Sequence, residues 1–233
     1  MATGATGNAG SMEGDDAVSR WLGHRIDRAC LALMLLIGVG MAGPAMARVP
    51  RILAFGDSLT SGFGLPQSQS FPAQLQAALA EKGIEARVVN AGASNDTTGD
   101  GLARLDWALA QKPDLVILEL GANDMLRGID PKIVRTNLEA MLKKIKASGA
   151  KVLLAGMLSA PNWGPEYRQE FDRLYPELAK EYGVMLYPFF LKGVAMDPAL
   201  NQSDGKHPNA RGVAAIVDGI VPDVARLIGG EKS

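Results

Sequence analysis

Histidine and cysteine are almost absent from this chain, which contains two histidines and one cysteine in 233 residues. One histidine, His24, and the single cysteine, Cys30, lie in an N-terminal segment that we expect to be removed. The remaining chain then has no thiol, which excludes a cysteine nucleophile, a disulfide framework and a Cys-type zinc site. With one histidine left, we also expect no metal centre. Any reaction that needs an imidazole base must therefore use His207.

An excess of charge of either sign is also lacking. The formal net charge is −1, and residues 1–47 contain three of the 24 basic and four of the 25 acidic residues, so 21 of each sign follow them. A neutral domain gives no electrostatic basis for binding nucleic acid. No Gly-x-Gly-x-x-Gly follows a predicted strand, and neither a P-loop nor the Gly-x-Ser-x-Gly of the α/β-hydrolases occurs. We therefore expect no nucleic-acid partner and no bound cofactor.

Residues 1–47 have the pattern of a secretory signal peptide. A region with three arginines precedes an apolar run from Cys30 to Gly43, and Ala45-Met46-Ala47 matches a signal-peptidase site. The run is shorter than the about 20 apolar residues of a membrane span. The sequence predicts cleavage after Ala47 and a periplasmic or secreted domain over 48–233, with no stable membrane insertion. A retained N-terminal anchor and a start at Met12 are the alternatives.

Apolar β-type runs alternate with helical patterns along residues 48–233. Several runs are apolar nearly throughout, as expected for strands covered on both faces. Five β-α units in one domain of this size predict an α/β fold, a flavodoxin-like three-layer α/β/α sandwich with a five-stranded parallel sheet. Pro222 is expected to kink or interrupt the last helix. The predicted strands are 51–55, 86–89, 115–120, 152–156 and 184–187, and the predicted helices are 71–82, 101–111, 131–148, 166–182 and 209–227.

Two segments at opposite ends of this domain suit nucleophilic catalysis. Ser58 follows the first predicted strand, and a serine needs a base to become nucleophilic at neutral pH. The Asp-x-x-His spacing across a glycine-containing turn lets the Asp204 carboxylate reach the Nδ1 atom of His207. The pattern predicts His207 as the general base for Ser58, with Asp204 orienting the imidazole. The plain alternatives are a turn serine and a solvated surface histidine.

Asn123 follows the third predicted strand, in the segment Gly-Ala-Asn-Asp. Its side-chain N–H is suited to donate to charge that develops on a substrate carbonyl oxygen. The alternative is a turn amide that hydrogen-bonds its own backbone. We expect Asp57 and Asp124 to brace loops rather than to catalyse. Since sites in parallel α/β sheets lie at the carboxyl ends of the strands, these separate segments are expected to meet.

These segments, together with Asn90-Ala91-Gly92-Ala93-Ser94-Asn95-Asp96-Thr97, resemble in order the blocks of the SGNH, or GDSL, hydrolase family. The match spans nearly the whole domain, and within the family the chain is most similar to the periplasmic acyl-CoA thioesterase I/arylesterase group. The resemblance implies a serine esterase with Ser58 as nucleophile, His207 as base and Asp204 as the carboxylate that orients it. It also implies hydrolysis of short- to medium-chain acyl esters, with acyl thioesters as a further class, through an acyl-enzyme.

The same resemblance implies three oxyanion donors, which are the Ser58 backbone N–H, a backbone N–H in the second block and the Asn123 side chain. The chain departs from the family in the second block, because Asn95 stands where the family has a glycine. Only the backbone N–H is needed, and asparagine tolerates the left-handed region well. We therefore expect Asn95 to keep this role, with its side chain at the rim. A shifted loop that uses Gly92 is the alternative.

The family's acyl group lies between the loops after the third and fourth strands, which correspond here to residues 125–129 and 157–165. For each candidate wall residue in these loops, the alternative is an ordinary core or rim position with no part in binding. The expected partner is a small-molecule ester or thioester, and both a monomer and a homo-oligomer are compatible with the sequence. A carbohydrate O-acetylesterase, a lysophospholipase and a non-catalytic acyl-binding protein are the alternative functions. The candidate wall residues are Leu126, Ile129, Leu158, Pro161 and Trp163.

Overall fold

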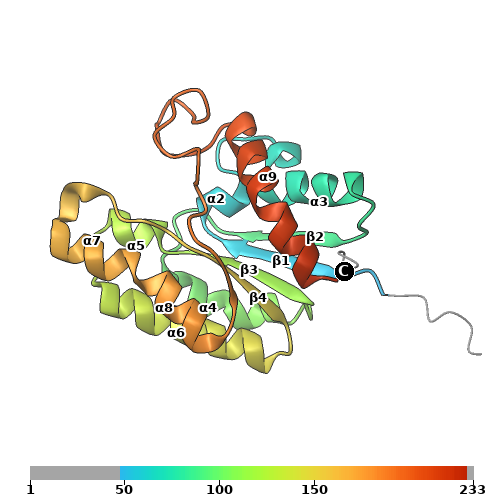
Figure 1. The fold of residues 1–233 in the computed structure, drawn as a ribbon, viewed down its shortest axis with the longest axis horizontal. Coiled ribbons are helices and arrows are strands. Elements are labelled where there is room, and N and C mark those ends of the chain that lie inside the picture. Colours follow the sequence, from blue (N-terminus) through green and yellow to red (C-terminus); the bar gives the residue numbers. More distant parts are fainter. Residues whose placement is uncertain (1–47, 230–233) are drawn as a thin grey trace, which may run out of the picture. The chain divides into compact units, whose positions relative to one another are not determined.

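The computed structural model describes residues 48–229, and the predicted signal peptide over 1–47 lies outside them. The strands of this range are β1 (Arg51–Gly56), β2 (Arg87–Gly92), β3 (Leu115–Glu119), β4 (Lys151–Ala155) and β5 (Met185–Tyr187). They form one sheet in the order β2-β1-β3-β4-β5, and every neighbouring pair is parallel (Figure 1). The strand order reverses between β1 and β3, and in doubly wound sheets ligands bind outside the carboxyl ends of the strands at such a point.

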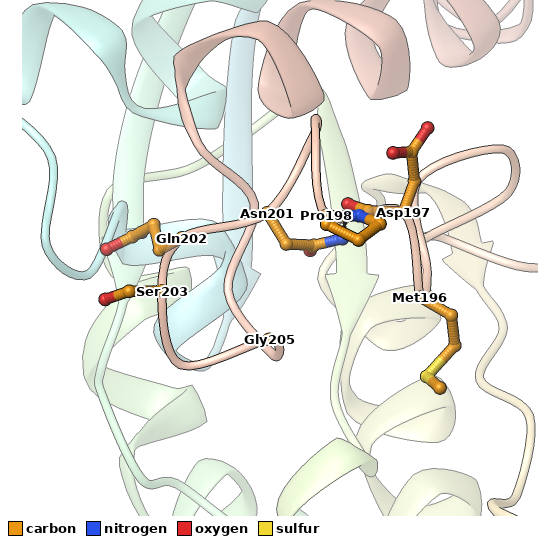
Figure 2. Close-up of a pocket in the computed structure, with 7 residues that line it drawn as sticks. All are labelled: Met196, Asp197, Pro198, Asn201, Gln202, Ser203 and Gly205. Carbon is orange, nitrogen blue, oxygen red and sulfur yellow. Dashed lines mark hydrogen bonds between the residues drawn. The ribbon is translucent and has the colours of Figure 1, made fainter.

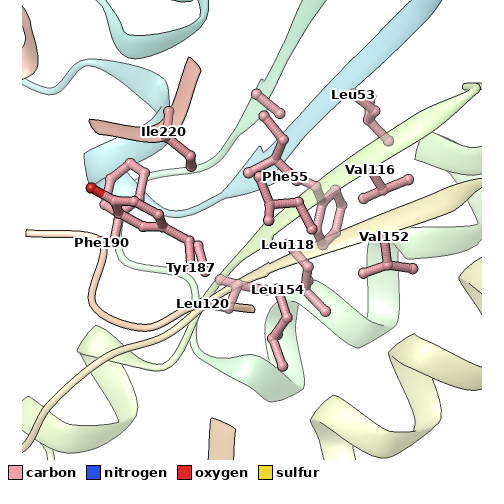
Figure 3. Packing of buried hydrophobic residues seen from close by; sticks show 14 of the residues in the cluster. Leu53, Phe55, Val116, Leu118, Leu120, Val152, Leu154, Tyr187, Phe190 and Ile220 are labelled. Carbon is pink, nitrogen blue, oxygen red and sulfur yellow. The ribbon is translucent and has the colours of Figure 1, made fainter. Parts of the chain in front are cut away.

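The central strands β1, β3 and β4 are buried on both faces, which explains why they are mostly apolar, whereas the edge strand β2 is partly exposed. Residues 52–55 of β1 and 115–119 of β3 have no solvent-exposed surface. Full burial of a large apolar side chain contributes about 1.5–3 kcal/mol to stability. The sheet therefore gives a firm base to the loops at its carboxyl edge. Side chains of neighbouring strands pack together in Figure 3, among them Leu53, Phe55, Val116, Leu118, Val152 and Leu154.

The longer helices are α3 (Phe71–Glu81), α4 (Thr98–Leu109), α6 (Pro131–Ala147), α7 (Pro165–Asp172), α8 (Leu174–Tyr182) and α9 (Ala210–Leu227). Two short helices, α2 (Ser58–Ser61) and α5 (Ala122–Leu126), begin within three residues of the ends of β1 and β3. Helix α3 packs against α9, and α6 packs against α4 and α8. Figure 1 shows α3 and α9 on one face of the sheet and α4, α6 and α8 on the other. The predicted three-layer α/β/α sandwich is confirmed.

Two helix boundaries differ from the sequence prediction for local reasons. The helix predicted over 166–182 is two helices, because Pro176 has no N–H to donate to the carbonyl of Asp172. Helix α4 begins at Thr98, three residues before the prediction. There the Thr97 side chain accepts the Asp100 N–H while the Asp100 carboxylate accepts the Thr97 N–H, which is a capping box.

Of the two outcomes expected at Pro222, a kink or an interruption of the last helix, the interruption is wrong. Helix α9 runs unbroken through this residue. Pro222 lies on the exposed face, and the residue whose carbonyl loses its helical donor, Asp218, is also exposed, so water can solvate that carbonyl. The buried face around Ile220 and Val224 holds the helix together. Strand β2 also extends to Gly92 and therefore contains Asn90, which the sequence places after the strand.

Candidate active site

Ser58 is the first residue of α2, and only Asp57 separates it from the end of β1. The turn between them is tight: a Cβ atom on Gly56 would lie 2.2 Å from Thr60 Oγ1. Asp57 caps the helix, since its Oδ1 accepts the Leu59 N–H at 2.9 Å. This turn holds Ser58 half-buried at the carboxyl edge of the sheet.

The structure brings Ser58, His207 and Asp204 together, although 149 positions separate the serine from the histidine. His207 Nε2 lies 2.9 Å from Ser58 Oγ, and His207 Nδ1 lies 2.6 Å from Asp204 Oδ2. The other carboxylate oxygen of Asp204 accepts the backbone N–H groups of Lys206 and His207 at 2.9 and 3.0 Å. The hydrogen bond from His207 and these two N–H groups hold the pKa of Asp204 well below its usual range. Asp204 is therefore a carboxylate that fixes the imidazole orientation.

The loop that carries His207 is held by contacts that sequence reasoning missed. The Gln202 side-chain amide donates to the carbonyls of Phe63 and Pro208, at 2.8 and 3.0 Å. The Phe63 ring lies with its centroid 4.6 Å from that of the His207 ring. Asn209 caps α9 and also donates to the carbonyl of Ala199. A pattern of turn residues gives no sign of the contacts with Phe63, because this residue comes from the segment after α2.

Asn123 lies in α5, just after β3, and its side chain points across to the ends of β1 and β2. Its Nδ2 donates to Asp57 Oδ2 at 3.1 Å and to the Asp96 carbonyl at 2.9 Å. The alternative of an amide bonded to its own turn is therefore wrong. Both amide hydrogens have acceptors in this structure, so donation to a substrate oxygen requires that one of these two bonds be exchanged.

Asn95 occupies the left-handed region with φ of 71°. Its carbonyl accepts a hydrogen bond from Arg127 at 2.8 Å. Within residues 48–229, neither the Asn95 N–H nor the Ser58 N–H has a hydrogen-bond acceptor. The N–H of Gly92 does have one, since it donates to Asn90 Oδ1 at 3.0 Å. These contacts favour Asn95 over Gly92 as a free backbone donor.

Arg104 joins the ends of β1 and β2 to the loop that contains Asn95. Its guanidinium donates to the carbonyls of Gly56 and Ala91, both at 2.8 Å, and pairs with Asp96 at 2.5 Å. It also lies over the Phe55 ring, 4.1 Å from the centroid. Arg104 belongs to the segment that resembles the family, but its role as a clamp follows only from these contacts.

Asp57 and Asp124 brace loops, as the sequence predicts. The two oxygens of Asp124 accept the N–H and the hydroxyl of Thr98, at 2.8 and 2.6 Å, and so fix the start of α4. Asp57 binds the Leu59 N–H and the Asn123 amide. Burial raises the pKa of Asp57 to about 7, and burial raises that of Asp124 as well.

Glu119, the last residue of β3, is a buried acid that sequence reasoning did not single out. It has no exposed surface, its Oε2 accepts the Thr60 hydroxyl at 2.6 Å, and burial raises its pKa well above the usual range. The signal in the sequence is one acidic residue inside an otherwise apolar strand, Leu-Val-Ile-Leu-Glu-Leu.

The candidate pocket walls lie in two loops that contact each other. A Cβ atom on Gly128 would lie 2.8 Å from the Trp163 ring, and the Tyr167 hydroxyl donates to the Ile129 carbonyl at 3.0 Å. Leu126, Leu158 and Trp163 are 48%, 43% and 44% exposed, which is high for large apolar side chains. Pro161 is also exposed. No hydrogen bond or ring contact of the described residues joins these five side chains to Ser58 or His207.

A pocket of about 360 Å³ lies beside the loop that carries Asp204 (Figure 2). Its lining comes from this one loop, with Met196 and Asp197 at one end and Gln202, Ser203 and Gly205 at the other. None of the predicted catalytic residues or candidate wall residues lines it, so it is not the acyl pocket expected from the sequence.

In the part of the chain that the structure describes, no helix combines the length and the apolar character needed to cross a membrane. Residues 54–215 match the family model described as GDSL-like lipase/acylhydrolase family. The chain is similar to the arylesterase of Vibrio mimicus, with 40% identity over 84% of this chain and 97% of the relative. It is 38% identical to thioesterase 1/protease 1/lysophospholipase L1 of Escherichia coli K12, over 78% of this chain and 86% of the relative.

A crystal structure of TesA is similar in fold and sequence. It superimposes with a TM-score of 0.72 at 43% identity, over 76% of this chain and 99% of the TesA chain. The two relatives and the TesA structure agree with the thioesterase I/arylesterase group that the sequence blocks resemble.

Proposed function

The chain belongs to the GDSL-like lipase/acylhydrolase family and is a serine esterase, and from this premise we propose that Ser58, His207 and Asp204 form its catalytic triad. The observation that carries the proposal is the continuous hydrogen-bonded line from Ser58 Oγ through both ring nitrogens of His207 to Asp204. Such a line is what a weakly acidic hydroxyl needs in order to act as a nucleophile. A non-catalytic acyl-binding protein is not supported, because the relatives are named as enzymes.

The reaction is a two-step acyl transfer. Ser58 Oγ attacks the carbonyl carbon of the ester as His207 Nε2 takes the hydroxyl proton. The tetrahedral intermediate then expels the alcohol, or the thiol of a thioester, which receives that proton from His207. Water, deprotonated by His207, attacks the acyl-enzyme, and collapse of the second intermediate releases the carboxylic acid and returns the proton to Ser58.

The negative oxygen of each intermediate is held by the backbone N–H groups of Ser58 and Asn95 and by the Asn123 amide. The absence of a hydrogen-bond acceptor for these two backbone N–H groups among residues 48–229 supports this assignment. Loss of one such donor typically costs about 3–4 kcal/mol of transition-state stabilisation, which is a factor of 10²–10³ in rate. Asn123→Ala is expected to show a loss of that size, whereas Ser58→Ala and His207→Ala should lose more.

The acyl group is bound between the loop after α5 and the loop after β4. The exposed side chains of Leu126, Leu158 and Trp163 support this location, since apolar surface near a site marks a place for an apolar ligand. Ile129 and Pro161 complete the proposed walls. A site built from two surface loops fits short- to medium-chain acyl groups.

The proposed substrates are small-molecule acyl esters, aryl esters among them, and acyl thioesters. The names of the Vibrio mimicus and Escherichia coli relatives support these two classes. The N-terminal pattern of residues 1–47 supports a periplasmic or secreted enzyme. The proposed reaction uses only groups of the protein and therefore needs no cofactor.

The test is a series of p-nitrophenyl esters from acetyl to long acyl chains, with an acyl thioester alongside and Ser58→Ala as the control. We expect the highest kcat/KM at short to medium length, measurable thioester hydrolysis and no turnover by Ser58→Ala. A preference for acetylated sugars identifies a carbohydrate O-acetylesterase instead, and a preference for lysophospholipids identifies a lysophospholipase. Turnover retained by Ser58→Ala contradicts the proposed triad.

A further inference from the structure

Two acidic side chains, Asp57 and Glu119, are buried together beneath the turn that carries Ser58. Both have no exposed surface. Glu119 Oε2 accepts the Thr60 hydroxyl at 2.6 Å and the Asp57 backbone N–H at 3.4 Å. Across residues 48–229, no Lys, Arg or His forms an ion pair with either acid. Two buried negative charges without a cation are strongly unfavourable, so at least one of the acids must be neutral.

The hydrogen bonds distinguish the two acids. Both oxygens of Asp57 accept N–H groups, from Leu59 and from the Asn123 amide. This arrangement suits an ionised carboxylate. Glu119 uses only Oε2 as an acceptor, and its Oε1 is a buried atom with no hydrogen-bond partner in the described structure. A proton on Oε2 would compete with the Thr60 hydroxyl and the Asp57 N–H, which both donate to that atom. Oε1 is therefore the oxygen that can carry the proton.

We propose that Glu119 is a positioning residue of this esterase: a neutral carboxylic acid, protonated at Oε1, that fixes Asp57 and through it the Asn123 amide. The proposal rests on the function proposed above, because it assigns Asn123 to the oxyanion. Glu119 does not touch the substrate. It acts through the contacts that its Oε2 makes under the nucleophile turn.

The packing leaves Glu119 little freedom to move. A Cβ atom on Gly56 would lie 2.4 Å from Glu119 Oε2, so the backbone of the nucleophile turn rests directly on the carboxyl group. From there the contacts run from Glu119 to the N–H of Asp57, and from the Asp57 carboxylate to Asn123 Nδ2 at 3.1 Å. A displacement of Glu119 therefore moves Asp57, which caps α2 and accepts the hydrogen bond that orients the Asn123 amide.

The neutral state matters because negative charge develops on the substrate oxygen close to Asn123. The groups that face the acid pair already include the carboxylates of Asp96 and Asp124 and the buried hydroxyl of Tyr175, while Arg104 binds the Gly56 carbonyl nearby. A charge on Glu119 would add to the negative potential there and oppose the oxyanion. Burial, followed by the charge of Asp57, raises the pKa of Glu119 well above its usual range, which agrees with the neutral acid.

An infrared measurement tests the protonation state without any use of activity. Near pH 9, about two pH units above the pKa of Asp57, we expect the carbonyl band of a protonated carboxyl group in the full-length enzyme. The band should disappear in Glu119→Gln and persist in Asp124→Asn, which removes a second buried acid. A spectrum without this band near pH 9, or a band that survives at that pH in Glu119→Gln, overturns the proposal.

A double-mutant cycle tests whether Glu119 acts through Asn123. Glu119→Met is expected to lower kcat by about tenfold or more with a smaller change in KM, and Glu119→Gln, which keeps a neutral acceptor for Thr60, should restore most of that loss. In an Asn123→Ala background, Glu119→Met should cost much less, since the group that it positions is gone. An equal loss in both backgrounds, or equal losses for the Met and Gln variants, contradicts the positioning role. If Glu119→Met does not fold, the infrared band and the kinetics of Glu119→Gln still decide.

The outcomes separate this proposal from the proposed function. Turnover retained by Ser58→Ala rejects the triad while leaving the infrared result for Glu119 intact. A missing infrared band rejects the neutral acid while leaving the triad intact.

Discussion

At the scale of single residues, the proposed chemistry depends on one imidazole and on the groups that surround it. His207 has Ser58 on one ring nitrogen and Asp204 on the other, and the Phe63 ring covers part of its face. Because Asp204 also accepts two backbone N–H groups of its own loop, its orientation is fixed before a substrate binds. The imidazole is therefore already aligned for proton transfer.

Asn95→Gly tests the contribution of the side chain that replaces the family glycine. Glycine adopts the left-handed φ at least as easily, so the backbone N–H should stay in place and kcat should change by less than about threefold. We expect the chain-length preference to shift, because the Asn95 side chain is exposed and is proposed to lie at the rim of the site. The measurement is kcat/KM over the p-nitrophenyl ester series. If turnover and chain-length preference are both unchanged, the side chain has no part in the site.

The sequence was enough to predict Ser58, His207, Asp204 and Asn123 as neighbours. Only one histidine lies outside residues 1–47, and sites in parallel α/β sheets lie at the carboxyl ends of the strands, so few alternatives remain. It was not enough to find Glu119, Phe63 or Gln202. The burial of Glu119 depends on the turn that folds over it, and the contacts of Phe63 and Gln202 join segments 139 positions apart. Neither kind of information is present in a local pattern.

At the scale of elements, the site depends on loops that leave three strands at the same edge of the sheet. The sequence predicts all five strands, because strands buried on both faces are apolar runs. It misplaces element ends where a single side chain decides them, as Thr97 does at the start of α4 and Pro176 does between α7 and α8. The short helices α2 and α5 are too brief to show a helical period.

Arg104→Met tests whether Arg104, on α4, holds the ends of β1 and β2 in place. The change keeps the long side chain over Phe55 but removes the bonds to the Gly56 and Ala91 carbonyls and to Asp96. We expect kcat to fall by about tenfold or more with little change in KM, because the oxyanion loop and the nucleophile turn lose their common support. Arg135→Met is the matched control, since Arg135 binds three carboxylates on α6 and α8 away from the site. An equal fall in kcat for both variants contradicts the clamp.

At the scale of the whole molecule, the three layers bury the acids Asp57 and Glu119 beneath the turn that carries Ser58, and this burial links stability to pH. The pKa of Asp57 is raised from 3.8 to about 7 on folding, so the folded state binds more protons than the unfolded state between these values. The contribution of this group to stability is fully present below about pH 4 and is lost as the pH rises through about 7. The general rules for parallel α/β folds predict the layers that create this burial. Only the tertiary structure shows which acidic residues these layers enclose.

Asp57→Asn should therefore flatten the dependence of stability on pH. Between about pH 4 and 7, the free energy of unfolding of the wild type should fall by up to about 1.4 kcal/mol per pH unit for this one proton, and the variant should lack that part of the slope. Urea unfolding at several pH values measures both slopes. Asp218→Asn, which changes an exposed carboxylate on α9, is the control and should keep the wild-type slope. Parallel curves for the wild type and Asp57→Asn would show that Asp57 does not titrate in this range.

The contact between the Ser58 hydroxyl and the His207 imidazole is tested most directly by labelling with a fluorophosphonate, followed by mass spectrometry of the modified peptide. The account predicts covalent modification of Ser58 in the wild type, and labelling slower by about 10³-fold or more in folded His207→Ala. Modification of a different residue, or labelling of Ser58 at the same rate without the imidazole, would contradict it.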